Sequence, residues 1–250
     1  LRDSAVAVND TYTVIPTGSL DLDRALGVGG YVLGRSTEIY GQDGIGKTTL
    51  ALYGVAECQK LFPNDMIGYI DMEGTLDLVW AAQHGVKLGP NFRVYTPENA
   101  EEVADALKQM IGSGLFTMIV VDSIGSMIPE AEKEKDADDV VIAKQAAIVT
   151  RMVKIAAPEA RKNNVAVVYI NQVRANLSGF GKATKTGGGW ALRFVTTHKL
   201  ELKRTDTKYE ARVGDVAKQE VGHQVGVKVE RNKVAPPHKT AKFSLFHTQS

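Results

Sequence analysis

A glycine-rich stretch at residues 41–48 reads Gly-Gln-Asp-Gly-Ile-Gly-Lys-Thr and completes the pattern G-x-x-x-x-G-K-[ST]. Glycines in this pattern let the backbone turn tightly, so that its N–H groups can face phosphate oxygens. The lysine is expected to reach the β- and γ-phosphates, and the threonine hydroxyl to ligate Mg²⁺. The stretch therefore predicts binding of a nucleoside triphosphate. The expected contacts are Gly41, Gln42, Asp43, Gly44, Ile45, Gly46, Lys47, Thr48 and Thr49.

The segments on either side of this stretch fit the same interpretation. Residues 37–40 read as a short strand, and residues 49–61 read as a helix whose N-terminus would face the phosphates. The alternative is a glycine-rich turn that matches the pattern by chance. Such a chance match arises in about one chain in a hundred of this length. The flanking strand and helix favour the phosphate-binding loop.

Length and composition narrow the class of protein. The 250 residues are 44% hydrophobic, which is enough for one large core. No apolar run approaches the roughly 20 residues that a membrane span needs, and residues 1–10 carry no apolar leader. The lone cysteine, Cys58, excludes an intramolecular disulfide and a thiolate-rich metal site. We expect a cytoplasmic protein without a membrane segment.

The charge is unevenly distributed along the chain. Residues 1–170 hold 15 Lys/Arg against 23 Asp/Glu, whereas residues 171–250 hold 15 against 6. A basic final third suggests a surface that faces a polyanion such as nucleic acid. It suggests equally well a basic face that meets the acidic part of a neighbouring subunit.

Apolar β-rich runs alternate with helical patterns, which predicts an α/β fold with a mainly parallel sheet and covering helices. Expected strands are 37–40, 66–70, 117–121 and 165–170. One helix is expected from the start signal Thr96-Pro97-Glu98 to about residue 110, and another from about Val141 until Pro158 kinks or ends it. Residues 195–203, 224–231 and 241–246 are expected to continue the sheet in antiparallel fashion. Residues 179–189 are expected to be irregular.

Polar residues follow the expected strands, at the edge where ligands collect in open α/β sheets. Asp122 after Met-Ile-Val-Val suits a Mg²⁺ ligand, or else a turn cap. Either Glu73 or Asp71 could activate a water molecule, and spacing alone does not choose between them. Gln172 could sense a γ-phosphate or cap a turn. For Trp80, packing on the following helix is favoured over stacking on a base.

Together these residues make the chain resemble the core ATPase domain of RecA-family recombinases, of the bacterial or phage type. The resemblance runs over nearly the whole chain and implies a RecA-like P-loop NTPase core, with a twisted, mostly parallel sheet, helices on both faces and antiparallel C-terminal strands. The matching segments are 17–23 (Thr-Gly-Ser-Leu-Asp-Leu-Asp), 25–27 (Ala-Leu-Gly), 34–35 (Gly-Arg), 38–41 (Glu-Ile-Tyr-Gly), 70–73 (Ile-Asp-Met-Glu), 76–77 (Leu-Asp), 120–123 (Val-Val-Asp-Ser) and 170–174 (Ile-Asn-Gln-Val-Arg).

The resemblance implies roles around ATP and Mg²⁺. It favours Glu73 over Asp71 as the base, makes Thr48 and Asp122 the metal ligands, and makes Gln172 the residue that couples the γ-phosphate to DNA. It places Asp77 and Trp80 at the adenine, which reverses the packing interpretation of Trp80. Catalytic roles are implied for Glu73, Lys47, Gln172, Arg231 and Lys233, the last two reaching the ATP of a neighbouring subunit. Arg231 stands where the family has lysine, which keeps the charge but changes the geometry.

The resemblance also implies DNA-binding segments. Residues 173–189 correspond to the family's second DNA loop and residues 130–140 to its first, and both are expected to be mobile. The first departs from the family pattern, because residues 130–139 lack glycines and hold six acids against two lysines. Basic side chains would contact phosphates, and Phe180 would stack among bases. The implied DNA-binding residues are Arg174, Phe180, Gly181, Lys182, Lys185 and Arg193.

The resemblance implies a DNA-dependent ATPase that forms a helical filament on single-stranded DNA and pairs it with homologous double-stranded DNA. Alternatives are another RecA-fold ATPase, such as a RadA/Sms-like repair factor or a helicase- or clock-type ATPase, and a nucleotide-binding regulatory module with little turnover. Residues 1–250 are expected to form one core domain with residues 1–16 as a lead-in. The family's N-terminal docking helix and C-terminal domain find no match, so an excised core or a short relative is expected.

Overall fold

The computed structural model describes residues 12–129, 138–175, 184–186, 189–213 and 216–246. Within them, a nine-stranded sheet has the order β11-β10-β9-β3-β7-β6-β4-β5, with β8 paired to β7 beside that row, and β1 and β2 form a separate ribbon. The strands are β1 Val14–Ile15, β2 Tyr31–Val32, β3 Ser36–Gly41, β4 Met66–Asp71, β5 Phe92–Tyr95, β6 Phe116–Asp122, β7 Ala166–Ala175, β8 Thr184–Thr186, β9 His198–Val213, β10 Val216–Asn232 and β11 Thr240–Phe246. The helices are α1 Leu20–Leu26, α2 Lys47–Leu61, α3 Leu78–Gln83, α4 Ala100–Gly112, the 3₁₀ turn η1 Ile124–Ser126, α5 Asp138–Asn163 and α6 Gly189–Val195.

The sheet is parallel through its centre, where β3, β7, β6, β4 and β5 run in one direction. The prediction of an α/β fold with a mostly parallel sheet is confirmed. The first C-terminal strand, β9, differs from expectation because it pairs with β3 in parallel, and the antiparallel pairing begins with β10 and β11. The reason is α6, which was not predicted: it brings the chain back to the amino edge of the sheet, where Thr197 N donates to Ser36 O at 2.8 Å before β9 starts.

The four predicted central strands are confirmed, and the main differences lie at helix ends. The helix α4 begins after Asn99, whose side chain accepts a hydrogen bond from Glu102 N at 2.9 Å, rather than at Thr96. Of the two outcomes expected at Pro158, a kink or a helix end, the end is excluded, because α5 continues through the proline. Its buried Val153, Ala156 and Ala160 pack against the core on both sides of the proline, so packing outweighs the lost backbone hydrogen bond.

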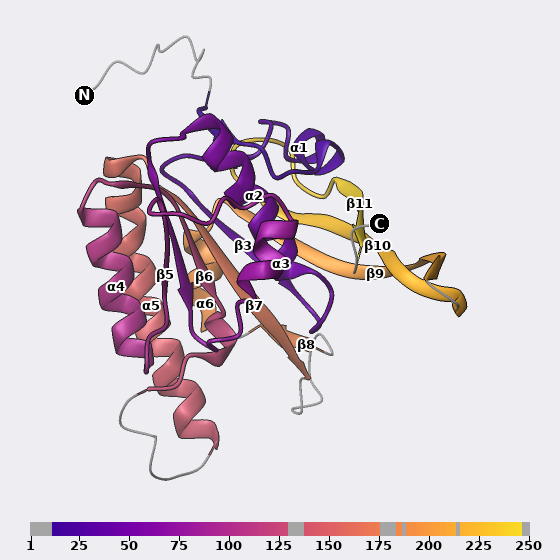
Figure 1. The fold of residues 1–250 in the computed structure, drawn as a ribbon. Coiled ribbons are helices and arrows are strands. Elements are labelled where there is room, and N and C mark those ends of the chain that lie inside the picture. Colours follow the sequence, from indigo (N-terminus) through magenta and orange to yellow (C-terminus); the bar gives the residue numbers. More distant parts are fainter. Residues whose placement is uncertain (1–11, 130–137, 176–183, 187–188, 214–215, 247–250) are drawn as a thin grey trace.

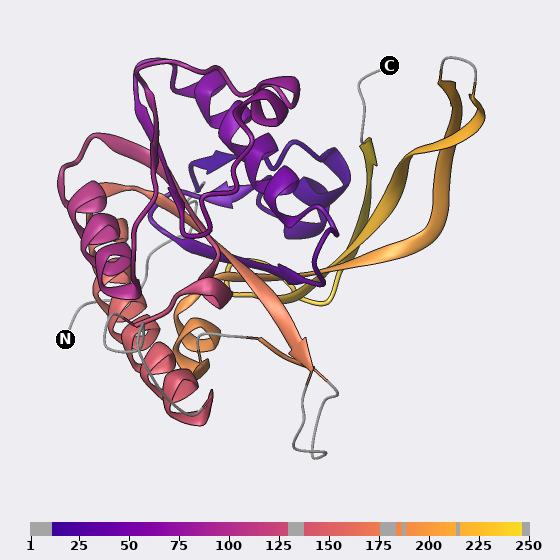
Figure 2. The ribbon, with the colours of Figure 1, turned by 60° about the horizontal axis from the view of Figure 1, so that its bottom comes forward.

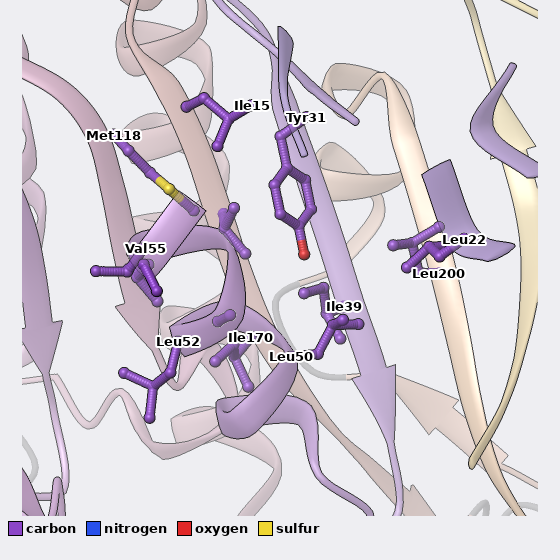
Figure 3. Close-up of a cluster of buried hydrophobic side chains, with 14 of the residues drawn as sticks. Ile15, Leu22, Tyr31, Ile39, Leu50, Leu52, Val55, Met118, Ile170 and Leu200 are labelled. Atoms are coloured by element: carbon purple, nitrogen blue, oxygen red, sulfur yellow. The ribbon is translucent and has the colours of Figure 1, made fainter. Parts of the chain in front are cut away.

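Two apolar clusters lie on opposite faces of the sheet. Helices α1, α2 and α3 cover one face, and α4, α5 and α6 cover the other (Figure 1). On the first face, Ile39 of β3 lies beside Leu50 of α2 with the Tyr31 ring above them, and Val55 of α2 lies farther along near Met118 of β6 (Figure 3). These side chains are fully buried, and each large aliphatic one contributes about 1.5–3 kcal/mol of transfer free energy to folding. The loop between β3 and α2 is therefore held between two well-packed elements.

Strands β9 and β10 continue past the rest of the sheet as a long hairpin (Figures 1 and 2). Tyr209 of the hairpin stacks on Phe246 of β11 at a ring-centroid distance of 5.2 Å. Glu220 pairs with Arg204 and, at 3.1 Å, with Lys208. These ion pairs are exposed, so they contribute little to stability. In the described part of the chain, no helix is both long and apolar enough to cross a membrane.

Candidate functional site

The carboxyl ends of four parallel strands bring the predicted polar residues to one edge of the sheet. Gly41 at the end of β3 lies opposite Gln172 of β7, and Asp71 at the end of β4 lies opposite Asp122 of β6. The loop 42–46 leaves this edge into α2. The convergence expected from sequence is therefore present.

The loop 42–46 has the backbone geometry that a phosphate cradle needs. Gly46, the N-cap of α2, has φ 94° and ψ 24°, a left-handed conformation that side chains other than glycine rarely adopt. A Cβ atom there would also lie 2.2 Å from Leu245 Cδ1. No side chain caps the first turn of α2, so its backbone N–H groups point into the loop as a site for an anion.

Lys47 is folded back onto this loop. Its Nζ donates to Gln42 O at 2.8 Å and Gly41 O at 3.1 Å, and lies 3.5 Å from the exposed Asp43 carboxylate. Burial lowers the pKa of the Lys47 ammonium below its ordinary value, and the charges of Asp43, Asp122 and Glu73 oppose that change. A phosphate in the loop would offer this desolvated cation a charged partner in place of carbonyl oxygens.

Thr48 and Asp122 lie in contact behind the loop. Asp122 Oδ2 accepts hydrogen bonds from Thr48 Oγ1 at 2.7 Å and from Tyr69 OH at 2.6 Å. Burial raises the pKa of the Asp122 carboxyl, with the two hydroxyls opposing the rise. A cation held between Thr48 and Asp122 would stabilise this desolvated carboxylate.

The oxygen atoms of Thr48 and Asp122 suit Mg²⁺, which protein side chains rarely coordinate without other ligands. In the described residues, no group of three or more His, Cys, Asp or Glu side chains forms a metal cage. Mg²⁺ commonly takes one or two protein oxygens and completes its shell with phosphates and water. Thr48 and Asp122 supply such a partial shell.

Glu73 lies next to Gln172, although 99 residues separate them in the chain. Gln172 Nε2 donates to Glu73 Oε1 at 3.2 Å. Ser123 Oγ donates to the same oxygen at 3.2 Å, and Ser126 Oγ donates to it as well. Asp71, the other candidate base, is buried and accepts a hydrogen bond from Leu76 N at 2.8 Å. Glu73 is the more exposed of the two carboxylates, and it faces the residue that leads into segment 173–189.

The predicted adenine residues lie on α3, close to the start of α2. Asp77 is the exposed N-cap of α3 and accepts hydrogen bonds from Val79 N at 2.8 Å and Trp80 N at 3.1 Å. The half-buried Trp80 packs against the core and donates from Nε1 to Thr49 Oγ1 at 3.4 Å. Both the packing and the adenine interpretations of Trp80 remain compatible with this position, and its adenine role stays a prediction.

Lys233 lies away from the phosphate loop of its own chain, whereas Arg231 lies opposite Lys199 of β9, which in turn pairs with Glu38 of β3. Lys233 N donates to Thr197 O at 3.1 Å, level with Ser36 at the amino edge of β3. Five residues of strand separate Ser36 from Gly41, about 17 Å at 3.3 Å per residue. Lys233 Nζ donates to the backbone oxygens of Phe194 and Val195 at the end of α6. Lys233 therefore lies near the opposite end of β3 from the phosphate loop.

The predicted DNA-binding residues are partly described. Phe180, Gly181 and Lys182 lie outside the described residues. Arg174 and Lys185 are backbone register partners in the antiparallel pair β7–β8, so residues 184–186 form a strand where an irregular segment was expected. Arg193 is exposed on α6. Of the segment 130–140, residues 130–137 lie outside the description, and residues 138–140 begin α5.

Sequence reasoning missed three residues that touch the site. Tyr69 reaches Asp122, Ser126 reaches Glu73, and Gln145 Nε2 donates to Ile124 O at 3.2 Å and Gly125 O at 3.1 Å. Tyr69 carried a usable signal, because it lies two residues before Asp71 on the same face of β4. Ser126 and Gln145 carried none, since their partners come from distant parts of the chain.

Comparison with known proteins agrees with this geometry. Residues 4–250 match the family model for the RecA N-terminal domain. The chain belongs to the RecA family. It is 38% identical over 235 residues to Protein RecA of Thermotoga petrophila, covering 94% of this chain and 64% of that protein. It is also 38% identical to Protein RecA of Laribacter hongkongensis over 250 residues, covering 99% of this chain and 68% of that protein.

A third RecA-family relative, Protein RecA of Symbiobacterium thermophilum, is 38% identical over 237 residues, covering 94% of this chain and 65% of that protein. The chain thus spans a little under two thirds of the length of the Thermotoga relative and of this one. The family match includes the loop 41–48, the strand ends and the C-terminal hairpin.

Proposed function

We propose that this RecA-family protein is a DNA-dependent ATPase that forms a filament on single-stranded DNA and promotes homologous pairing and strand exchange. One observation carries the proposal beyond nucleotide binding: Gln172 touches Glu73 at 3.2 Å and also begins the chain segment expected to contact DNA. A residue placed between a base and a DNA-binding segment can make hydrolysis depend on DNA. The protein would act in the cytoplasm, where it would meet both ATP and DNA.

The loop 41–48 and the first turn of α2 would bind the phosphates of ATP. Lys47 would exchange the carbonyl oxygens of Gly41 and Gln42 for β- and γ-phosphate oxygens. Thr48 and Asp122 would hold Mg²⁺, which neutralises developing charge on the phosphates when bound. Asp77 and Trp80, beside the start of α2, would contact the adenine. Together these residues orient the γ-phosphate toward Glu73.

Glu73 would accept a proton from the attacking water. It is exposed, so a water molecule can reach it, and it is anchored through Oε1 alone among the contacts described. Its carboxylate would take the proton as the oxygen–phosphorus bond to the γ-phosphate forms and the β-phosphate oxygen leaves. Gln172 would exchange Glu73 for the γ-phosphate and carry that change into segment 173–189.

Arg231 and Lys233 would complete the site from a neighbouring subunit. Lys233 lies near the amino edge of the sheet, and Arg231 lies opposite Lys199 of β9, two strands away from the strand that leads into the phosphate loop. Positive charges supplied in this way stabilise the charge of the phosphoryl-transfer transition state. An assembly that repeats this contact head to tail, with a rotation that does not close into a ring, would form an open helical filament.

DNA would bind along segment 173–189 and α6. Arg174, Lys182, Lys185 and Arg193 would contact phosphates, and Phe180 with Gly181 would stack among bases. Such phosphate contacts make affinity for DNA fall as salt rises, with little dependence on sequence.

The test is ATP hydrolysis by the intact protein with and without single-stranded DNA. We expect DNA to raise the rate, and Glu73→Gln to lower turnover at least about a hundredfold while ATP still binds. Glu101→Gln, on the exposed surface of α4, is the matched control and should leave the rate unchanged. A rate that ignores DNA would contradict the recombinase proposal, and unchanged hydrolysis in Glu73→Gln would remove Glu73 as the base.

A further inference from the structure

The 3₁₀ turn η1, Ile124–Ser126, lies beside Glu73 and is hydrogen-bonded to helix α5. It follows Asp122 directly, and Ile124 and Gly125 are buried. The buried amide of Gln145 on α5 donates to the carbonyl oxygens of both residues, at 3.2 and 3.1 Å. A short turn tied to a long packed helix keeps its side chains in fixed positions.

Ser126, the last residue of η1, contacts the Glu73 carboxylate. Its hydroxyl donates to Glu73 Oε1, and its oxygen lies 2.8 Å from Ser123 Oγ, which is itself 3.2 Å from the same carboxylate oxygen. While Ser126 donates to Glu73, the single hydroxyl proton of Ser123 can point either to the same carboxylate oxygen or to Ser126 Oγ. Hydrogen bonds to a charged acceptor are the stronger kind, so this contact restricts the side chain of Glu73.

The same turn also seats Gln172. A Cβ atom on Gly125 would lie 3.2 Å from Gln172 Cβ, which shows how closely the glutamine side chain packs on the turn. Gln172 then adds its own hydrogen bond to Glu73 Oε1. In the described residues, every hydrogen bond found to the carboxylate falls on this one oxygen, which leaves Oε2 for a water molecule.

We propose that Ser126 is a positioning residue for Glu73, holding Oε1 so that Oε2 faces the attacking water. The inference rests on the proposed role of Glu73 as the base. Beyond that role, we assign the orientation of the Glu73 carboxylate to the Ser126 hydroxyl. This hydroxyl would keep holding the carboxylate when Gln172 moves away. The glutamate side chain is exposed and long, and without Ser126 only Ser123 and Gln172 hold it, each at 3.2 Å, so its carboxylate gains access to further rotamers.

Kinetics of Ser126→Ala and Ser126→Thr test the proposal. Because one hydrogen bond to a charged group is lost, we expect Ser126→Ala to lower kcat roughly tenfold, with or without DNA, while KM for ATP changes less than about twofold. Ser126→Thr keeps the hydroxyl and should recover most of kcat. Ser113→Ala, which removes an exposed hydroxyl at the end of α4, is the control and should change neither constant. A Ser126→Ala protein with unchanged or raised kcat overturns the proposal.

A crystal structure of nucleotide-free Ser126→Ala gives a readout that does not depend on hydrolysis. We expect the Glu73 carboxylate to leave its position beside η1 and occupy more than one rotamer, while Gln145 still holds the turn. A Glu73 side chain that stays in place without the serine overturns the inference even in an active protein. If the intact protein hydrolyses no ATP, the proposed function fails, and this structure still decides whether Ser126 holds Glu73.

Discussion

Gln172 donates its side-chain amide to Glu73 Oε1 at 3.2 Å, from the strand that leads into segment 173–189. If this contact couples DNA to hydrolysis, Gln172→Asn should break the coupling, because the shorter side chain cannot span the same distance. We expect ATP to bind as before and a low basal rate to persist, while stimulation by single-stranded DNA disappears. ATP affinity and hydrolysis, each measured with and without DNA, check this.

The matched control for Gln172→Asn is Gln59→Asn. Gln59 lies on α2 and contacts the backbone of Lys87, well along the helix from the phosphate loop. This variant should keep its response to DNA. Retention of full stimulation in Gln172→Asn would contradict the coupling role.

Arg231 and Lys233 predict complementation between inactive subunits. Glu73→Gln removes the base, and Lys233→Ala removes the cation supplied to the neighbour, so each protein alone should be nearly inactive. In an equal mixture, about a quarter of the interfaces join an intact base to an intact cation, so a similar fraction of activity should return. Steady-state hydrolysis across mixing ratios, with DNA present, measures this recovery.

Mixing Glu73→Gln with Lys47→Ala is the control for complementation. Both changes fall on the half of the site that holds the phosphate loop and the base. Every subunit in this mixture carries one of the two changes, so no interface has an intact half of that kind. This mixture should stay inactive. Equal recovery in both mixtures, or none in either, would place Lys233 outside the neighbour's site.

Patterns local to the sequence predicted the central fold well. Residues 117–121 and 165–170 are apolar and β-branched because these strands are buried on both faces, and both became central strands. Errors arose where distant packing decides. Pro158 was expected to kink or end its helix, and the helix does not end there because the core contacts of α5 hold it on both sides of the proline. The hydrogen bond that Glu102 N donates to the Asn99 side chain sets the start of α4, and Thr96 does not.

The site shows the same division. The phosphate loop and Asp122 could be found because their chemistry requires a short, fixed spacing along the chain. The partners of these residues could not, because they are chosen by the fold: Tyr69 approaches Asp122 from the neighbouring strand, and Ser126 meets Glu73 across two loops. A sequence pattern records which groups a site needs, whereas the orientation of those groups depends on elements far along the chain.

Glu38 and Lys199 form a buried ion pair beneath the site. Lys199 Nζ lies 3.3 Å from Glu38 Oε2, with the two side chains 11% and 1% exposed, and Asn171 Nδ2 donates to Glu38 Oε1 at 2.9 Å. Replacing one partner leaves an uncompensated buried charge, so Lys199→Met should lower the free energy of unfolding by about 3–5 kcal/mol. Glu38→Gln combined with Lys199→Met should recover part of this loss.

Urea unfolding of the two single variants, the double variant and the unchanged protein measures this coupling. Lys203→Met is the control, because Lys203 pairs with Glu201 at 3.1 Å but is 70% exposed. An exposed pair contributes at most about 1 kcal/mol. Additive losses in the double variant would show that Glu38 and Lys199 do not stabilise each other.

His198 predicts a loss of stability in mild acid. Its ring is buried, Nδ1 lies 3.3 Å from Thr37 Oγ1, and burial lowers its pKa to about 4. The unfolded chain has a histidine pKa near 6.5, so between pH 6.5 and 4 it binds more protons than the folded protein. The contribution of His198 to stability is therefore greatest above pH 6.5 and falls as the pH drops, by about 2 kcal/mol at pH 5.

Urea midpoints at pH 7 and pH 5 should differ less in His198→Asn than in the unchanged protein. His238→Asn, an exposed site with φ 68° that asparagine tolerates, should keep the full difference. An equal pH dependence in His198→Asn would show that another group controls acid sensitivity.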